Sequence, residues 1–302
     1  MTVTARRLVD GERVLLLDSD AGYRVSQLDV GFPAARVVTQ PRPGRDGEDD
    51  TTGLHGASAV SMSVMLVPGA KTIVALRDAL RSFCHPGARP FLVLDEDGTQ
   101  RRIRLRADQQ TAPIVSPTHQ EMQLSWRAPD GVVESAAEQI GTAEATTAAL
   151  GGRFYDRTYP MAYTSRPSEG GTYGTTYPAT YPVDEVSVPV GSVTVRNDGN
   201  VPVLPLLRLY GPATEPRVEN QLTGERLLFT GLTIAAGDWL EIDCRTSTIR
   251  LNGLESQSRY ARLDFAASSF LRMLPGANTI RYYPVTFDAG ARLEVRYRSA
   301  WL

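Results

Sequence analysis

The chain has 302 residues, a formal net charge of −2 and an apolar content of 42%. This length is comfortable for two domains, and the apolar content is sufficient for a hydrophobic core. The near-neutral charge argues against a protein that binds duplex DNA, because such proteins usually carry a basic surplus.

Residues 1–133 are predicted to form a β-rich domain with one helix. Alternation is clearest at residues 60–66, where Val60, Met62, Val64 and Leu66 share one face of a strand. Further strands are expected at Val14–Asp18, Tyr23–Val30, Pro90–Leu94, Arg102–Arg106 and Glu121–Arg127.

The period of the apolar residues changes after Pro68-Gly69. Ile73, Leu76, Leu80 and Phe83 recur at the spacing of an amphipathic helix, which is predicted over about residues 70–84. His85-Pro86-Gly87 is a typical helix stop.

Residues 134–183 are predicted to be a connector rich in Tyr, Thr, Pro and Gly. Glu134–Leu150 is interpreted as a short helix or a loop. Tyr-Pro pairs within 158–182 favour extended backbone and oppose helix, so the rest is expected to be an ordered, extended segment packed on a neighbour.

Residues 184–302 carry strand patterns separated by turn residues, which is typical of a sandwich or barrel. Because most strands have one polar and one apolar face, a two-layer antiparallel sandwich is favoured. The turns are predicted at Asn197-Asp-Gly-Asn, Leu222-Thr-Gly-Glu, Gly237-Asp-Trp, Asn252-Gly and Leu274-Pro-Gly-Ala-Asn.

Enzyme motifs are absent: the chain has no HExxH, Walker loop, G-x-S-x-G elbow or paired CxxC. No enzymatic activity, cofactor or metal is predicted. His55, His85 and His119 are scattered and are not expected to converge. Cys84 and Cys244 are interpreted as reduced, half-buried thiols. No run approaches the roughly 18–20 apolar residues that span a bilayer, so no membrane insertion is expected.

Two charged clusters are candidate contact sites. Arg102, Arg104 and Arg106 are predicted to share one strand face, which is either solvated or an interface strip against an acidic neighbour. Asp46, Glu48, Asp49 and Asp50 form the densest acidic patch, and its bland interpretation is a solvated loop tip. A calcium loop would need a D-x-[DN]-x-[DN]-G spacing that is missing.

The order and spacing of the turn motifs in the last third resemble the distal tail proteins of long, flexible-tailed bacteriophages. Similar elements occur earlier: the Gly44–Gly47 turn, the helix sequence ending at Phe83, and Pro90-Phe-Leu-Val-Leu. The Tyr-Pro units of 152–160 resemble the actinobacterial-phage branch.

This resemblance implies an N-terminal β-sandwich with a helix that closes a hexameric ring, and a C-terminal galectin-like antiparallel sandwich at residues 184–302. It implies a structural adaptor at the virion tail tip, made and assembled in the host cytoplasm. Its partners would be copies of itself, the tail tube protein, the tail-tip hub and receptor-binding proteins, with DNA only passing through the ring.

The expected ring gives each of the two charged clusters a possible role. The arginine face and the acidic loop are predicted to meet between subunits, or else the acidic loop lies at the lumen. The alternative function is a carbohydrate-binding module for host recognition, with Trp239 stacking on a sugar. The sugar-contacting His/Asn/Arg cluster of true galectins has no counterpart in the sequence, which argues against that alternative.

Overall fold

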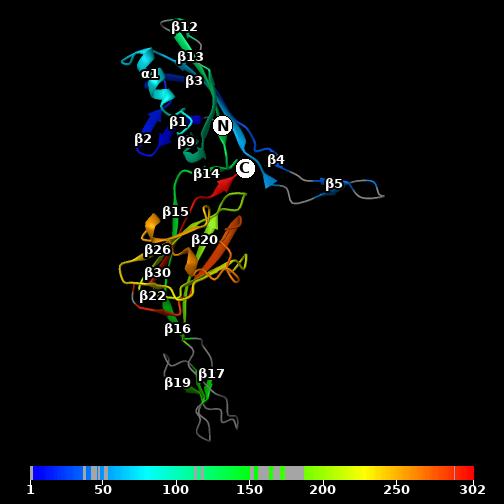
Figure 1. Cartoon of the computed structure of the whole chain (residues 1–302), viewed down its shortest axis with the longest axis vertical. Coiled ribbons are helices and arrows are strands. Elements are labelled where there is room, and N and C mark those ends of the chain that lie inside the picture. Colours follow the sequence, from blue (N-terminus) through cyan, green and yellow to red (C-terminus); the bar gives the residue numbers. More distant parts are fainter. Residues whose placement is uncertain are drawn as a thin grey trace. The chain divides into compact units, whose positions relative to one another are not determined.

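The computed structural model describes residues 3–36, 39–41, 46, 48–50, 54–111, 114–116, 119–149, 153–155, 163–165, 171–173, 187–288 and 290–302 (Figure 1). The chain forms two compact units. The first combines Met1–Glu138 with Asp198–Val201 and Arg298–Leu302, and the second combines Gln139–Asn197 with Pro202–Tyr297. The sequence-based division at residues 133 and 184 differs from these units, because the second unit is inserted between parts of the first.

Two antiparallel sheets form the body of the first unit. The six-stranded sheet has, in spatial order, β2 (Arg13–Leu16), β1 (Val3–Asp10), β9 (Phe91–Glu96), β10 (Thr99–Arg104), β14 (Val133–Ser135) and β31 (Ala300–Trp301). The five-stranded sheet has β11 (Arg106–Thr111), β13 (His119–Ala128), β8 (Ser58–Leu66) and β3 (Tyr23–Val30), with β12 (Ile114–Ser116) also on β13.

A long hairpin completes the strands of this unit. It contains two successive antiparallel ladders, which pair β4 (Ala35–Arg36) with β7 (Leu54–His55) and β5 (Thr39–Pro41) with β6 (Glu48–Asp50).

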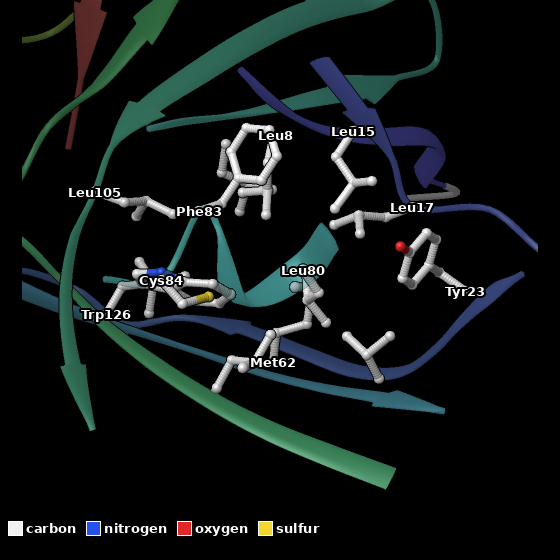
Figure 2. Packing of buried hydrophobic residues seen from close by; sticks show 14 of the residues in the cluster. Leu8, Leu15, Leu17, Tyr23, Met62, Leu80, Phe83, Cys84, Leu105 and Trp126 are labelled. Carbon is white, nitrogen blue, oxygen red and sulfur yellow. The ribbon is translucent and has the colours of Figure 1, made fainter. Parts of the chain in front are cut away.

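One hydrophobic core joins both sheets of the first unit to its helix. The predicted face of β8 is confirmed: Val60, Met62, Val64 and Leu66 are at most 2% exposed. Figure 2 shows side chains of the two sheets and of the helical segment pointing toward one another, with Leu8 and Met62 on opposite sides of the cluster.

The helix α1 (Ile73–Arg81) is shorter than predicted at both ends. Thr72 is the N-cap, and its side chain accepts a hydrogen bond from the backbone N of Ala75 at 3.3 Å. Leu76, Leu80 and the following Phe83 are buried, as their spacing predicted. Burial of this apolar face is what stabilises a helix of only nine residues.

Two five-stranded antiparallel sheets form the body of the second unit. One has β15 (Gln139–Glu144), β30 (Arg292–Tyr297), β21 (Leu206–Tyr210), β26 (Trp239–Asp243) and β27 (Thr248–Leu251). The other has β16 (Thr146–Ala149), β20 (Ser187–Asn197), β28 (Gly276–Tyr282), β23 (Arg217–Asn220) and β24 (Arg226–Leu228).

Smaller elements complete this unit. The 3-10 helices are η1 (Glu255–Gln257) and η2 (Tyr260–Arg262). Three short strands form one sheet, in the order β25 (Thr233–Ile234), β22 (Ala213–Thr214) and β29 (Thr286–Phe287). A second three-stranded sheet contains β17 (Arg153–Tyr155), β18 (Tyr163–Ser165) and β19 (Gly171–Tyr173).

The helix or loop predicted for Glu134–Leu150 is wrong, because strands occupy the described part of this segment. β15 pairs with β30 from Gln139↔Tyr297 to Glu144↔Arg292. Ala143 is 3% exposed and belongs to the second core. The Ala and Thr residues are therefore used as small strand residues against a neighbouring sheet. The Tyr-Pro pairs expected to be extended lie outside the described residues.

The antiparallel β architecture predicted for the last third is confirmed. Leu207, Leu209, Leu240 and Ile242 are fully buried on the inner face of neighbouring strands, and Leu293 and Val295 continue that face. Both cysteines are buried rather than half-buried, Cys84 in the first core and Cys244 in the second. No helix in the described part of the chain is long and apolar enough to cross a membrane.

Candidate interaction surfaces

Arg102 is used inside the first unit. Its Nη2 and Nε atoms lie 2.7 and 3.0 Å from Oε2 of Glu134, on the neighbouring strand. The guanidinium also lies 4.3 Å from the centre of the Phe91 ring. Because Glu134 is only 5% exposed and would be costly to leave unpaired, this pair keeps Arg102 within its own sheet and less available to a neighbouring molecule.

The single arginine face predicted for Arg102, Arg104 and Arg106 is wrong. The chain leaves the six-stranded sheet after Arg104, and Arg106 begins a strand of the other sheet. At the change, Leu105 is completely buried and its N–H donates to the carbonyl O of Pro90 at 2.8 Å.

Arg104 and Arg106 are both exposed, but on different sheets. Arg106 is paired in register with Arg127 of β13, which is also exposed. Two like charges directly opposite each other repel, so this corner of the five-stranded sheet is a concentrated positive site.

The acidic patch is largely a strand rather than the predicted loop tip. Glu48, Asp49 and Asp50 form β6, in register with residues 39–41 of β5. Asp46 is exposed. The side chains of residues 48–50, and the whole of Gly47, lie outside the described part of the structure. The inter-subunit and lumen roles of this patch stay predictions.

Trp239 packs on an aromatic neighbour. It begins β26 opposite Tyr210 of β21, and the two ring centres are 6.3 Å apart. The Arg292 guanidinium also lies 3.9 Å from the centre of the Tyr210 ring. Trp239 is half-buried, and its backbone N–H donates to Oδ1 of Asn252 at 3.0 Å. These contacts make Trp239 a packing residue of its sheet.

The Leu274-Pro-Gly-Ala-Asn motif is closed by its own asparagine. Oδ1 of Asn278 accepts from the N–H of Leu274 at 3.0 Å, and its Nδ2 donates to the carbonyls of Leu274 and Gly276 at 2.7 and 3.1 Å. Asn220 adds a bond from its Nδ2 to Oδ1 of Asn278 at 3.2 Å. Since both asparagines are completely buried, their bonding groups have no water to replace these partners.

Side-chain bonds also hold the turns at 222–225 and 252–253. Glu225 of the Leu222-Thr-Gly-Glu turn accepts from Nε and from the backbone N of Arg272, both at 2.6 Å. Asn252 of the Asn-Gly turn donates from Nδ2 to Oδ1 of Asp238 at 2.9 Å. The sequence predicted these residues as turn formers, but not their side-chain bonds across the fold.

The Asn197-Asp-Gly-Asn segment holds the end of the first unit's sheet. The N–H groups of Asn200 and Val201 both point to the carbonyl O of Ala300, at 3.0 and 3.3 Å. A Cβ added to Gly199 would lie 1.8 Å from that oxygen. Glycine is therefore required here by close backbone approach, whereas Gly276 is required by its φ of +93°.

A polar hollow of about 410 Å³ lies on the five-stranded sheet of the first unit. Its lining consists of neutral side chains, mostly Ser, Thr and Gln, and includes no carboxylate, imidazole or thiol. The lining residues are Gln27, Ser61, Met62, Ser63, Gln109, Thr111, Gln123, Leu124 and Ser125.

No metal centre is formed by the described residues, since no three His, Cys, Asp or Glu side chains gather at one point. His55 and His85 are exposed, and Nδ1 of His85 accepts from the N–H of Gly87 at 3.1 Å. The side chain of His119 is outside the described part. Burial raises the pKa of the Cys84 and Cys244 thiols to about 12, so both are poor nucleophiles at neutral pH.

Comparisons with known proteins point to a phage tail component. The model of a family described as siphovirus-type tail component, C-terminal domain, matches residues 198–301. The resemblance inferred from the turn motifs is confirmed over that region; the actinobacterial origin stays a prediction. No curated protein sequence matches the chain.

Solved structures show the same fold over the whole chain. The Dit (gp 19.1) protein of phage SPP1, described as a paradigm of the hub adsorption apparatus in phages that infect Gram-positive hosts, is similar with a TM-score of 0.60 and 12% identity. That match covers 98% of this chain and 99% of the SPP1 chain. A chain of the phage P2 baseplate in its Ca-activated conformation matches with a TM-score of 0.53 and 11% identity, over 99% and 98% of the two chains.

Proposed function

We propose that this protein is a structural adaptor of a siphovirus-type phage tail, which forms a ring between the tail tube and the tail-tip hub. The observation that carries the proposal is the full-length match to the SPP1 hub protein, together with the tail-component family match at residues 198–301. The structural match includes both units, so it supports a role for the whole chain and not only for its C-terminal part.

The first unit supplies the surfaces that a closed ring needs. β2 is a four-residue edge strand of the six-stranded sheet, and its Val14 and Leu16 are 56% and 50% exposed. An exposed sheet edge with apolar side chains readily joins another chain. A head-to-tail contact of this kind closes into a ring when its rotation divides the circle, as in the hexamer we propose.

Charge supports a second contact between subunits. Arg104 and the Arg106–Arg127 pair are exposed cations, and residues 46–50 carry the acidic cluster that is their proposed partner on the next subunit. Arg102 is left out of this proposal because Glu134 already pairs with it. The net charge of −2 suits a channel through which DNA passes without binding.

The proposal places the protein at the virion tail tip after assembly in the host cytoplasm, with the hub and receptor-binding proteins as further partners. A carbohydrate-binding function is not favoured, because the Trp239 ring packs on Tyr210.

Negative-stain microscopy and light scattering of the purified chain, alone and mixed with tail tube protein, test the ring. We expect annular particles. Arg104→Glu and Arg106→Glu, made separately, should each reduce ring formation, and Arg217→Glu in the second unit should not, since Arg217 is an exposed control. Monomeric particles under both conditions would contradict the ring, and rings unaffected by both reversals would contradict the charge contact alone.

A further inference from the structure

An exposed aromatic cluster lies on the second unit, in the long connection between β27 and β28. Phe265 is 58% exposed and Tyr260 is 40% exposed. Their ring centres are 5.2 Å apart, and the Tyr260 ring stacks on Phe270 at 6.5 Å with an interplanar angle of 16°. Phe270 in turn packs against the second core, so the three rings lead from the core to solvent. No step of the proposed ring uses this cluster.

The segment that carries the cluster is held rigidly. Leu263 is buried and forms a bridge with Phe229, and the N–H of Asp264 donates to the carbonyl of Leu228 at 2.9 Å. Further along, Oγ of Ser268 accepts from the N–H of Leu228 at 3.0 Å, and the N–H of Ser269 donates to the carbonyl of Arg226 at 2.8 Å. A preorganised aromatic surface loses little conformational entropy when a partner binds.

Two arginines, Arg259 and Arg262, and one aspartate, Asp264, lie next to the rings along the chain, which leaves a net positive charge there. Among the described residues, no carboxylate forms an ion pair with Arg259 or Arg262, and Arg262 is exposed. Of the nearby acids, Glu255 pairs with Arg250 at 3.3 Å, whereas Asp264 is a single carboxylate whose Oδ1 accepts a hydrogen bond from the N–H of Ala266 at 3.1 Å. A partner that covers the rings gains by bringing carboxylates to these guanidinium groups.

We propose that Tyr260, Phe265 and Phe270, flanked by Arg259 and Arg262, form a docking surface for an acidic polypeptide segment that carries an aromatic or large aliphatic side chain. Exposed aromatic rings with arginine are the composition of protein-binding hot spots. A sugar is a poorer fit, because Phe270 stacks on the Tyr260 ring and the flanking side chains bring positive charge rather than the neutral acceptors that sugar hydroxyls use. The apolar side chain of the partner covers Phe265, and its carboxylates pair with the two arginines.

A displayed library of random 12-residue peptides, selected on the immobilised full chain, tests this surface. We expect enrichment of peptides that combine Asp or Glu with Phe, Trp, Leu or Met. The same selection on Phe265→Ala should lose those sequences. Fluorescence anisotropy with one enriched peptide should show an affinity reduced about tenfold by Phe265→Ala and a similar or larger loss with Arg262→Glu.

Val285→Ala is the matched control, because Val285 is a 48% exposed apolar residue in the same unit, and it should bind the peptide as the wild type does. The proposal is overturned if the two selections enrich the same sequences or if the enriched peptides lack acidic residues. It is also overturned if Phe265→Ala leaves peptide binding intact. In that case, a loss of binding to an oligosaccharide panel would indicate a sugar site, and a changed oligomeric state would indicate a contact between copies of the chain. None of these readouts requires the ring, so a failure of the ring proposal is seen separately.

Discussion

The two units bury similar apolar cores but secure their connections by different means. In the first unit, α1 and the turn after it place Leu76, Leu80 and Phe83 between the sheets. In the second unit, the connections between strands are closed by polar side chains, of which Asn220 and Asn278 are completely buried. The difference teaches that two units with similar cores can differ in what holds their connections: apolar contacts in the first unit and buried hydrogen bonds in the second.

The strongest test of this comparison removes the helix contact. Leu80→Ala should lower the free energy of unfolding of the first unit by about 2–5 kcal/mol, because it removes a completely buried side chain and leaves a cavity. Urea denaturation followed by tryptophan fluorescence in a Trp239→Phe background reports this unit through Trp126 and Trp301. Val74→Ala, 53% exposed on the same helix, should change stability by less than about 0.5 kcal/mol. Equal effects of the two variants would break the comparison.

The second test removes a turn side chain. Asn278→Ala should destabilise the second unit by about 1–3 kcal/mol, since the N–H and C=O of Leu274 are left without their partner. Calorimetry measures the loss, and hydrogen–deuterium exchange should show faster exchange at residues 271–280. Gln221→Ala, at an exposed turn position, is the control. An unchanged melting transition for Asn278→Ala would mean that the turn is held by its backbone alone.

The third test concerns a property that the two cores share, the burial of one cysteine thiol in each. Burial raises the pKa of Cys84 and Cys244 from 9.0 to about 12, so folding favours the neutral thiol. Their contribution is complete below pH 9 and is lost as the pH rises toward 12, by about 1.4 kcal/mol per pH unit for each thiol. Urea denaturation at pH 8 and pH 10 should show a smaller loss for Cys84→Ala and Cys244→Ala than for the wild type. The same loss of unfolding free energy in the wild type and the variants would show that burial does not raise the thiol pKa values.

The smallest effect is expected from a surface pair. Arg208 and Glu241 lie 2.9 Å apart on the outer side of the second unit, with side chains 28% and 20% exposed. A double-mutant cycle with Arg208→Gln and Glu241→Gln should give a coupling energy of about 0.2–1 kcal/mol, reduced by salt. A coupling as large as the Asn278 effect would show that surface charge, rather than the buried turns, stabilises this unit.

Residue periodicity predicted the elements whose environment is uniform along their length. β8 and α1 each bury one face, and both appear in the sequence as a regular apolar pattern. The change of sheet at Leu105 was not predictable in this way, because alternation continues through it: Arg104 points outward, Leu105 inward and Arg106 outward. Only the tertiary position of the next strand shows that the two arginines belong to different sheets.

The candidate site was predictable to a smaller degree. Exposed cations at Arg104 and Arg106 follow from sequence, but the capture of Arg102 by Glu134 joins residues far apart in the chain. β15 was missed because Ala, Thr and Glu permit several conformations, and its pairing with β30 decides among them. The sequence shows the three aromatic residues of the cluster. It does not show which of them are exposed, because that depends on the stacking of Phe270 on Tyr260.

The placement of β31 has a consequence for how the protein is made. Residues 300–301 pair with β14, and Gly199 approaches Ala300 from the segment at 198–201. During translation, the other five strands of the six-stranded sheet therefore leave the ribosome long before β31, which covers the free edge of β14. The edge of β14 therefore stays unpaired while the inserted unit is translated. An unpaired edge can pair wrongly with another nascent chain, which leads to aggregation.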